Sequence, residues 1–198
     1  MSGNLAEQPK NGNYTHEDYL AWDGDERCEI IDGYAYMLAA PTTQHQRISA
    51  YLQYHMFDYL EGKPCEVFSA PFGVRLFPEE QERKKKTLRI YRKGVTVEPD
   101  LSIICNPEQL DETGCNGPPT LVVEILSPSN KHYLEKLNAY MSAGVQEIWI
   151  VDPKLQTIFL YLRKDNEYVI STLEPPATLR SPTFPGLEIK LSDIFPNE

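Results

Sequence analysis

The stretches Val97-Glu98-Pro99-Asp100-Leu101-Ser102-Ile103-Ile104-Cys105 and Leu121-Val122-Val123-Glu124-Ile125-Leu126 determine how the rest of this chain is expected to fold. The second stretch is typical of a strand buried on both faces, because aliphatic and β-branched residues follow one another without polar alternation. Glu124 lies in the middle of it, where an unpaired carboxylate would be costly. The sequence therefore predicts a cation, a lysine or a water-filled cleft beside Glu124, unless this side chain faces solvent near a sheet edge.

A second acid and a lysine accompany Glu124. Asp100 opens the first strand directly after Pro99, and Lys136 lies on the helix expected after the second strand. Two acids on neighbouring strands and a lysine on the next helix can together hold a divalent cation. On an ideal helix His132, Lys136 and Tyr140 fall on one side. The residues expected to pack on the sheet form a separate apolar stripe: Leu134, Leu137 and Met141.

Length and composition indicate one domain. The chain has 198 residues and 41% hydrophobic content, enough for a single core. We expect a flexible N-terminus over residues 1–13 and one domain over 14–198. The net charge of −10 predicts no general attraction to nucleic acid. Residues 79–93 differ, with seven basic and three acidic residues, and are either a solvated loop or an arm that contacts phosphates.

The spacing of the cysteines and the length of the apolar segments indicate where in the cell the protein is located. Cys28, Cys65, Cys105 and Cys115 are scattered without zinc-ligand spacing, which favours reduced thiols. The first residues are polar, and no stretch approaches the length needed to span a membrane. We therefore expect a soluble cytoplasmic protein without membrane partners.

The order of predicted elements indicates a mixed α/β (α+β) fold. A short helix after Thr15 precedes two strands joined at Asp32-Gly33, and a long helix spans residues 44–60. The buried stripe expected on this long helix consists of Ile48, Leu52, Met56, Tyr59 and Leu60. Further strands follow, and then the helix bearing Lys136, which residues 127–130 are expected to cap. An antiparallel C-terminal set of strands comes last. This order predicts a mixed central sheet with helices packed on it.

The same residues resemble a known family. The strings 97–100 and 121–129, Lys136 with Tyr140, and residues 144–153 resemble the bacterial restriction-endonuclease-like family of the PD-(D/E)XK nuclease superfamily. Residues 29–33 and His45 also match its N-terminal pattern. The resemblance covers roughly residues 14–192 and implies a restriction-endonuclease-like fold.

The resemblance implies a catalytic site. By similarity, Asp100 and Glu124 would bind Mg²⁺, or alternatively Mn²⁺, and Lys136 would position the attacking water. The usual lysine position of the motif is Leu126 here, and some relatives carry the lysine on the following helix, as at Lys136. His45 corresponds to a polar position near the metal in some members. Glu29 is a further candidate, in contact with the metal either directly or through another residue.

Three functions remain open at this point. The first is a Mg²⁺-dependent endonuclease that hydrolyses phosphodiester bonds of DNA, or alternatively RNA, as a homodimer. The second is a catalytically inactive protein of the same fold that binds nucleic acid or protein. The third, a glycosidase that uses the two acids, leaves Lys136 without a role. Lys136 could also be an ordinary solvated lysine, and His45 a polar residue at a helix start.

Overall fold

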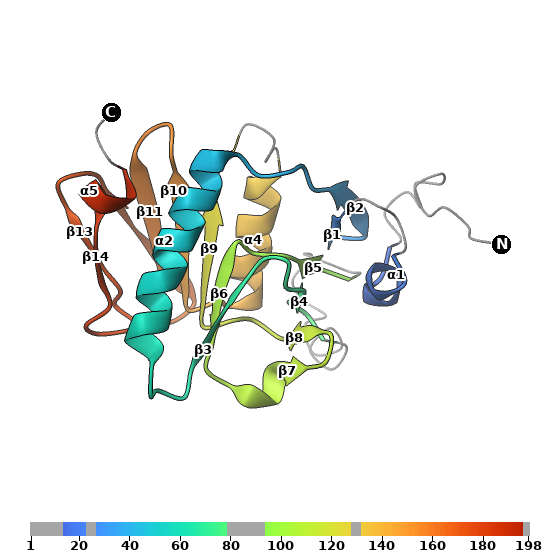
Figure 1. Ribbon diagram of the computed structural model, residues 1–198. Helices are drawn as coiled ribbons and strands as arrows, with labels where there is room; N and C mark the ends of the chain where they lie inside the picture. Colours follow the sequence, from blue (N-terminus) through green and yellow to red (C-terminus); the bar gives the residue numbers. More distant parts are fainter. Residues whose placement is uncertain (1–13, 23–26, 79–93, 128–131, 196–198) are drawn as a thin grey trace.

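The computed structural model describes residues 14–22, 27–78, 94–127 and 132–195. Its centre is a mixed sheet in the spatial order β12 (Glu167–Leu173), β11 (Thr157–Lys164), β10 (Glu147–Asp152), β9 (Leu121–Ile125), β6 (Leu101–Ile104) and β3 (Glu66–Ser69) (Figure 1). Within it β9 and β10 run parallel, and the other neighbouring strands run antiparallel. The predicted mixed central sheet is confirmed.

Two helices cover opposite faces of this sheet (Figure 1). Helix α2 (Thr43–Leu60) buries Ile48, Leu52, Met56 and Leu60, the spacing predicted from the sequence. These residues share a core with the C-terminal elements β13 (Thr178–Arg180), β14 (Glu188–Lys190) and α5 (Leu191–Ile194). Helix α4 (Tyr133–Ala143) packs on the other face.

A second sheet of short strands, which the sequence did not predict, lies on the α4 side. Its order is β2 (Tyr34–Met37), β1 (Cys28–Ile31), β5 (Thr96–Val97), β4 (Val74–Arg75), β8 (Gly114–Asn116) and β7 (Leu110–Asp111). Helix α1 (His16–Leu20) and a 3-10 helix over Pro107–Gln109 complete the structure. The predicted turn between β1 and β2 is confirmed, since Asp32 and Gly33 both have positive φ (51° and 79°).

The start and the buried side of α4 differ from the prediction. The helix begins at Tyr133 with His132 as its N-cap, whereas the sequence favoured a cap at 127–130. Of the residues expected to pack on the sheet, Leu137 is buried, but Leu134 is 54% exposed. The buried side of the helix also carries Lys136 and Tyr140. Polar partners on the sheet explain this rotation, as described below. The predictions for residues 1–13 and 79–93, and for 128–130 of the helix start, lie outside the described residues.

The prediction of reduced thiols is wrong for two cysteines. Cys65, just before β3, and Cys105, just after β6, form a disulfide where these two strands pair. Cys28 and Cys115 are free and buried. The sequence could not reveal this pair, because the two cysteines are 40 residues apart and meet only through strand pairing. Separately, no helix in the described part of the chain has the length and apolar character needed to cross a membrane.

Reduction of this disulfide is expected to destabilise the fold. Closing a loop of this length restricts the unfolded chain, so its loss should lower the free energy of unfolding by about 2–4 kcal/mol. Urea denaturation with and without dithiothreitol measures the change. A Cys65→Ala/Cys105→Ala variant serves as the control, since its unfolding should not respond to the reductant. Equal midpoints for the wild type under both conditions would contradict the prediction.

Candidate active site

The two predicted acids lie at the same end of neighbouring strands. Leu101 pairs with Val123 between β6 and β9, so Asp100 and Glu124 are the next residues beyond this pair. Leu101 and Val123 face the core under α2, whereas Val122 faces the core under α4. Because successive side chains of a strand alternate between faces, Glu124 belongs to the α4 side, and Asp100 lies next to it, just before β6 begins. The sheet therefore brings them to one place.

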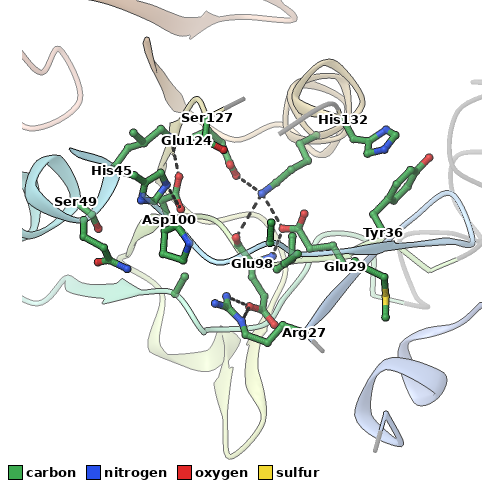
Figure 2. Close-up of a pocket in the computed structure, with 18 residues that line it drawn as sticks. Arg27, Glu29, Tyr36, His45, Ser49, Glu98, Asp100, Glu124, Ser127 and His132 are labelled. Carbon is green, nitrogen blue, oxygen red and sulfur yellow. Dashed lines mark hydrogen bonds and ion pairs between the residues drawn. The ribbon is translucent and has the colours of Figure 1, made fainter. Parts of the chain in front are cut away.

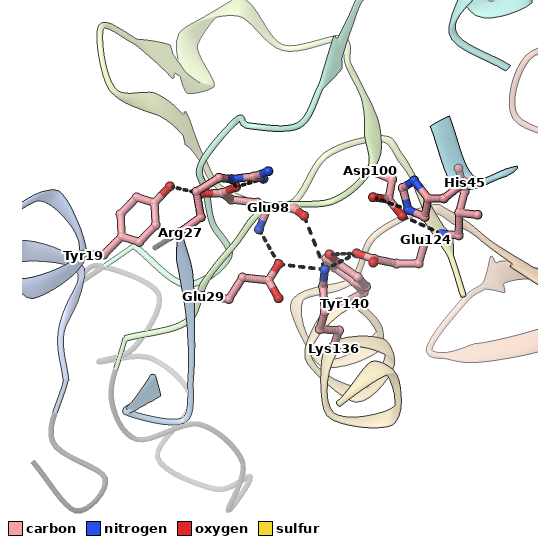
Figure 3. Close-up of polar contacts among 10 residues, drawn as sticks. Tyr19, Arg27, Glu29, His45, Glu98, Asp100, Glu124, Lys136 and Tyr140 are labelled. Atoms are coloured by element: carbon pink, nitrogen blue, oxygen red, sulfur yellow. Dashed lines mark hydrogen bonds and ion pairs between the residues drawn. The ribbon is translucent and has the colours of Figure 1, made fainter. Parts of the chain in front are cut away.

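Glu124 is 1% exposed and has two partners on α4. Its Oε1 lies 2.6 Å from Lys136 Nζ, and it accepts a hydrogen bond of 2.6 Å from the Tyr140 hydroxyl (Figure 3). Lys136 and Tyr140 are four residues apart, so the two side chains leave the helix on the same side. These contacts satisfy the requirement for a cation that the sequence of β9 imposed.

Lys136 is held by more than Glu124. Its ammonium group lies 2.7 Å from Glu29 Oε1 and donates a longer hydrogen bond, 3.4 Å, to the Glu98 carbonyl oxygen. The lysine is 4% exposed, so it is not an ordinary solvated helix residue. Glu29 also accepts a hydrogen bond of 2.7 Å from the Glu98 backbone N–H. Strand β1 therefore supplies the second carboxylate that fixes the ammonium group.

Asp100 is held by α2 and by the backbone of β9. Its Oδ1 lies 3.1 Å from His45 Nε2, and its Oδ2 accepts a 2.7 Å hydrogen bond from the Ile125 N–H. His45 lies in the first turn of α2, where its N–H donates to the side chain of the N-cap Thr42. Its Nδ1 is buried without a hydrogen-bond partner among the described residues. The predicted residues Asp100, Glu124, Lys136 and His45 are thus brought together.

Four residues of this network were not predicted as site residues: Tyr19, Arg27, Glu98 and Tyr140. Glu98 accepts hydrogen bonds from Arg27, through Nε at 2.9 Å and through Nη2, and from the Tyr19 hydroxyl at 2.9 Å (Figure 3). Tyr140 carried a usable signal, namely its position four residues after Lys136. Arg27 and Tyr19 carried none, since only tertiary structure brings them to Glu98.

The charges in the site are unbalanced. Burial raises the pKa of Glu124 to about 8; Lys136 acts to lower it, and the neighbouring carboxylates of Asp100 and Glu29 raise it further. Burial acts to lower the pKa of Lys136, but the surrounding carboxylates outweigh it and the pKa is raised. Burial is the main cause of the raised pKa of Glu124, whereas the excess of carboxylates over cations is the cause of the raised pKa of Lys136. The carboxylates thus favour the charged form of Lys136, and burial favours the protonated form of Glu124.

These residues line a pocket of about 140 Å³ (Figure 2). Its polar lining includes Glu29, His45, Asp100, Glu124 and Lys136. The end of β2 and the residues after it supply an apolar part of the wall, namely residues 37–39 and Pro41. The pocket therefore gives solvent access to a group of side chains that are mostly buried.

The donor set suits a hard cation that retains water. In the described residues no group of three or more His, Cys, Asp or Glu side chains could by itself hold a metal ion. Mg²⁺ does not require such a cage, because it is usually bound through one or two carboxylates and keeps several waters. Asp100 and Glu124 fit this requirement. Both known contacts of Glu124 engage Oε1, so coordination through Oε2 would leave them intact.

The Uma2 family, described as "Putative restriction endonuclease", matches residues 16–192. This chain belongs to the Uma2 family. The family resemblance inferred from the sequence is confirmed, and membership of Uma2 supports a nuclease-like function. The roles assigned to Asp100, Glu124, Lys136 and His45 remain predictions.

Two individual proteins are similar to this Uma2 chain. An uncharacterized protein of Synechocystis sp. strain PCC 6803 is 27% identical over 146 residues, which are 73% of this chain and 66% of that protein. The match therefore spans just under two thirds of the relative. A crystal structure from Anabaena variabilis ATCC 29413, described as a "putative nuclease belonging to DUF820", has a TM-score of 0.69 at 20% identity. It covers 91% of this chain and 97% of the other, and it confirms the fold.

Proposed function

We propose that this protein is a Mg²⁺-dependent endonuclease that hydrolyses phosphodiester bonds of DNA. The observation that carries the proposal is the contact of 2.6 Å between Lys136 Nζ and Glu124 Oε1, in a pocket that Asp100 also lines. Two carboxylates and an ammonium group beside solvent are the groups that this reaction needs. Membership of the Uma2 family supports the same reaction class.

Asp100 and Glu124 would hold the cation. When bound, Mg²⁺ supplies Lewis-acid chemistry, which stabilises charge on phosphoryl oxygens and lowers the pKa of water. His45 and the Ile125 N–H fix the Asp100 carboxylate, and Tyr140 fixes that of Glu124. Because both carboxylates are held in place, little reorganisation is needed when the cation arrives.

Lys136 would orient the attacking water and stabilise negative charge on the scissile phosphate. Glu29 and Glu124 hold its ammonium group between them, which restricts its position. A fixed ammonium group that is itself largely buried interacts strongly with developing negative charge. Glu29 would therefore act by positioning Lys136, and Arg27 and Tyr19 by positioning Glu98 behind it.

A cleavage assay tests the proposal. Supercoiled plasmid and single-stranded DNA are incubated with the purified protein in Mg²⁺, in Mn²⁺ and in EDTA. We expect cleavage with either metal, none in EDTA, and none for Asp100→Asn, whose side chain has nearly the same shape. Equal cleavage by wild type and Asp100→Asn would indicate a contaminant and refute the proposal. DNA binding without cleavage under every condition would instead support a catalytically inactive binding protein.

A further inference from the structure

An aromatic pair lines the pocket beside the proposed catalytic residues. The rings of Tyr36, on β2, and His132, at the start of α4, have centroids 4.0 Å apart and planes inclined by 45° (Figure 2). Both residues line the pocket. The His132 side chain is 44% exposed and also lies 3.9 Å from Glu135. The pair is therefore accessible to a ligand that occupies the pocket.

The fold places this pair next to the two residues that hold the catalytic ammonium group. Tyr36 is the cross-strand partner of Glu29, so their side chains share one face of the β1–β2 hairpin. On α4, the Lys136 N–H donates to the His132 carbonyl, which places His132 one helical turn away. One strand spacing and one helical turn are each about 5 Å, so Tyr36 lies close to Glu29 and His132 close to Lys136.

Charge alone gives this site little attraction for a polyanion. The pocket lining contains Glu29, Glu98, Asp100 and Glu124, and its cations Arg27 and Lys136 already contact carboxylates. The whole chain has a net charge of −10. Stacking of a nucleobase on an aromatic ring needs no excess of positive charge, and it works with any base.

We propose that Tyr36 and His132 form a stacking platform for an unpaired base next to the scissile phosphate, which makes single-stranded DNA the preferred substrate. This inference rests on the proposed function, because it places the phosphate at Asp100, Glu124 and Lys136. In a duplex each base is paired and stacked between its neighbours, so the platform cannot reach it without extrusion of the base. A single strand presents its bases freely.

The test measures binding in EDTA, where no cleavage is expected. The probes are a short fluorescein-labelled oligothymidylate, a duplex of the same length, and an abasic oligomer with the same number of phosphates. Tyr36→Ala should weaken oligothymidylate binding about tenfold, the effect of losing one stacked base. Tyr36→Phe should bind like the wild type because it keeps the ring. Binding of the duplex and of the abasic oligomer should change less than about twofold.

Tyr54→Ala is the matched control. Tyr54 is 64% exposed on α2 and does not line the pocket. Like Tyr36 it lies beside a histidine, since the centroids of the Tyr54 and His55 rings are 5.2 Å apart. Its replacement should leave all three affinities unchanged. Thermal unfolding of each variant verifies that the protein is folded at the assay temperature.

The outcomes separate this inference from the proposed function. Unchanged oligothymidylate binding by Tyr36→Ala, an equal loss with Tyr54→Ala, or tighter wild-type binding to the duplex would each overturn the platform, even if the protein cleaves DNA. A selective loss with Tyr36→Ala would support the platform even if the wild type fails to cleave. In that case only the catalytic proposal would fall.

Discussion

Replacement of Lys136 with methionine is expected to reduce metal-dependent DNA cleavage by at least about 100-fold, the usual loss when one preorganised electrostatic group is removed. The same change should lower the free energy of unfolding by about 3–5 kcal/mol, because it leaves buried carboxylates without their cation. Lys136 is 4% exposed and contacts both Glu29 and Glu124. Methionine keeps much of the lysine volume and removes only the charge. Plasmid cleavage and urea denaturation measure the two effects.

Lys154→Met provides the control for this experiment. Lys154 is exposed in the turn between β10 and β11, and its replacement should change neither quantity. The destabilisation caused by Lys136→Met should also become smaller in acid, because protonated carboxyls no longer need a cation. Full activity together with a loss of stability below about 1 kcal/mol would show that the ammonium group is neither catalytic nor needed for the fold.

Replacement of Glu124 with glutamine is expected to abolish the stabilisation of the folded protein by Mg²⁺. A cation that binds only the folded state raises its melting temperature, and the neutral amide is a poor ligand for a hard cation. We therefore expect Mg²⁺ or Mn²⁺ to raise the melting temperature of the wild type and not that of Glu124→Gln. Thermal scans with increasing metal concentration measure the difference. Glu167→Gln, on the exposed edge strand β12, is the control and should respond to metal like the wild type.

The same variant has an expected pH dependence without metal. Burial raises the pKa of Glu124 to about 8 from an ordinary value of 4.5, so the folded protein retains a proton that the unfolded chain releases. This contribution to stability is complete below the unfolded pKa and is lost as the pH rises towards 8. Relative to Glu124→Gln, the wild type should lose up to about 1.4 kcal/mol per pH unit across this window. A stability difference independent of pH would contradict the raised pKa.

Periodic patterns and local turn chemistry explain which parts of the fold were predictable. The stripe Ile48, Leu52 and Met56 in α2 and the Asp32-Gly33 turn depend on residues close in sequence, and the structure confirms both. The rotation of α4 was not predictable from its apolar pattern. Leu134 is exposed and Lys136 buried because the sheet below presents carboxylates, whose position depends on strand pairing.

The candidate site also contains residues that were predictable from the sequence and residues that were not. Glu124 in an apolar strand required a partner, and Lys136 on the next helix was the obvious cation. His45 was expected near the site only by family resemblance. Contacts that span long stretches of sequence had no local signal, such as Arg27 and Tyr19 on Glu98 and the disulfide between Cys65 and Cys105.

The sequence by itself determined that a carboxylate would be buried in β9 and would need a cation, because removing an ion from water is costly whatever the fold. Only the tertiary structure decided which groups meet that need. Strand pairing brings Asp100 beside Glu124, the β1–β2 hairpin brings Glu29 to Lys136, and α2 brings His45 to Asp100. Such contacts depend on the packing of elements far apart in the chain, which no local pattern of residues encodes.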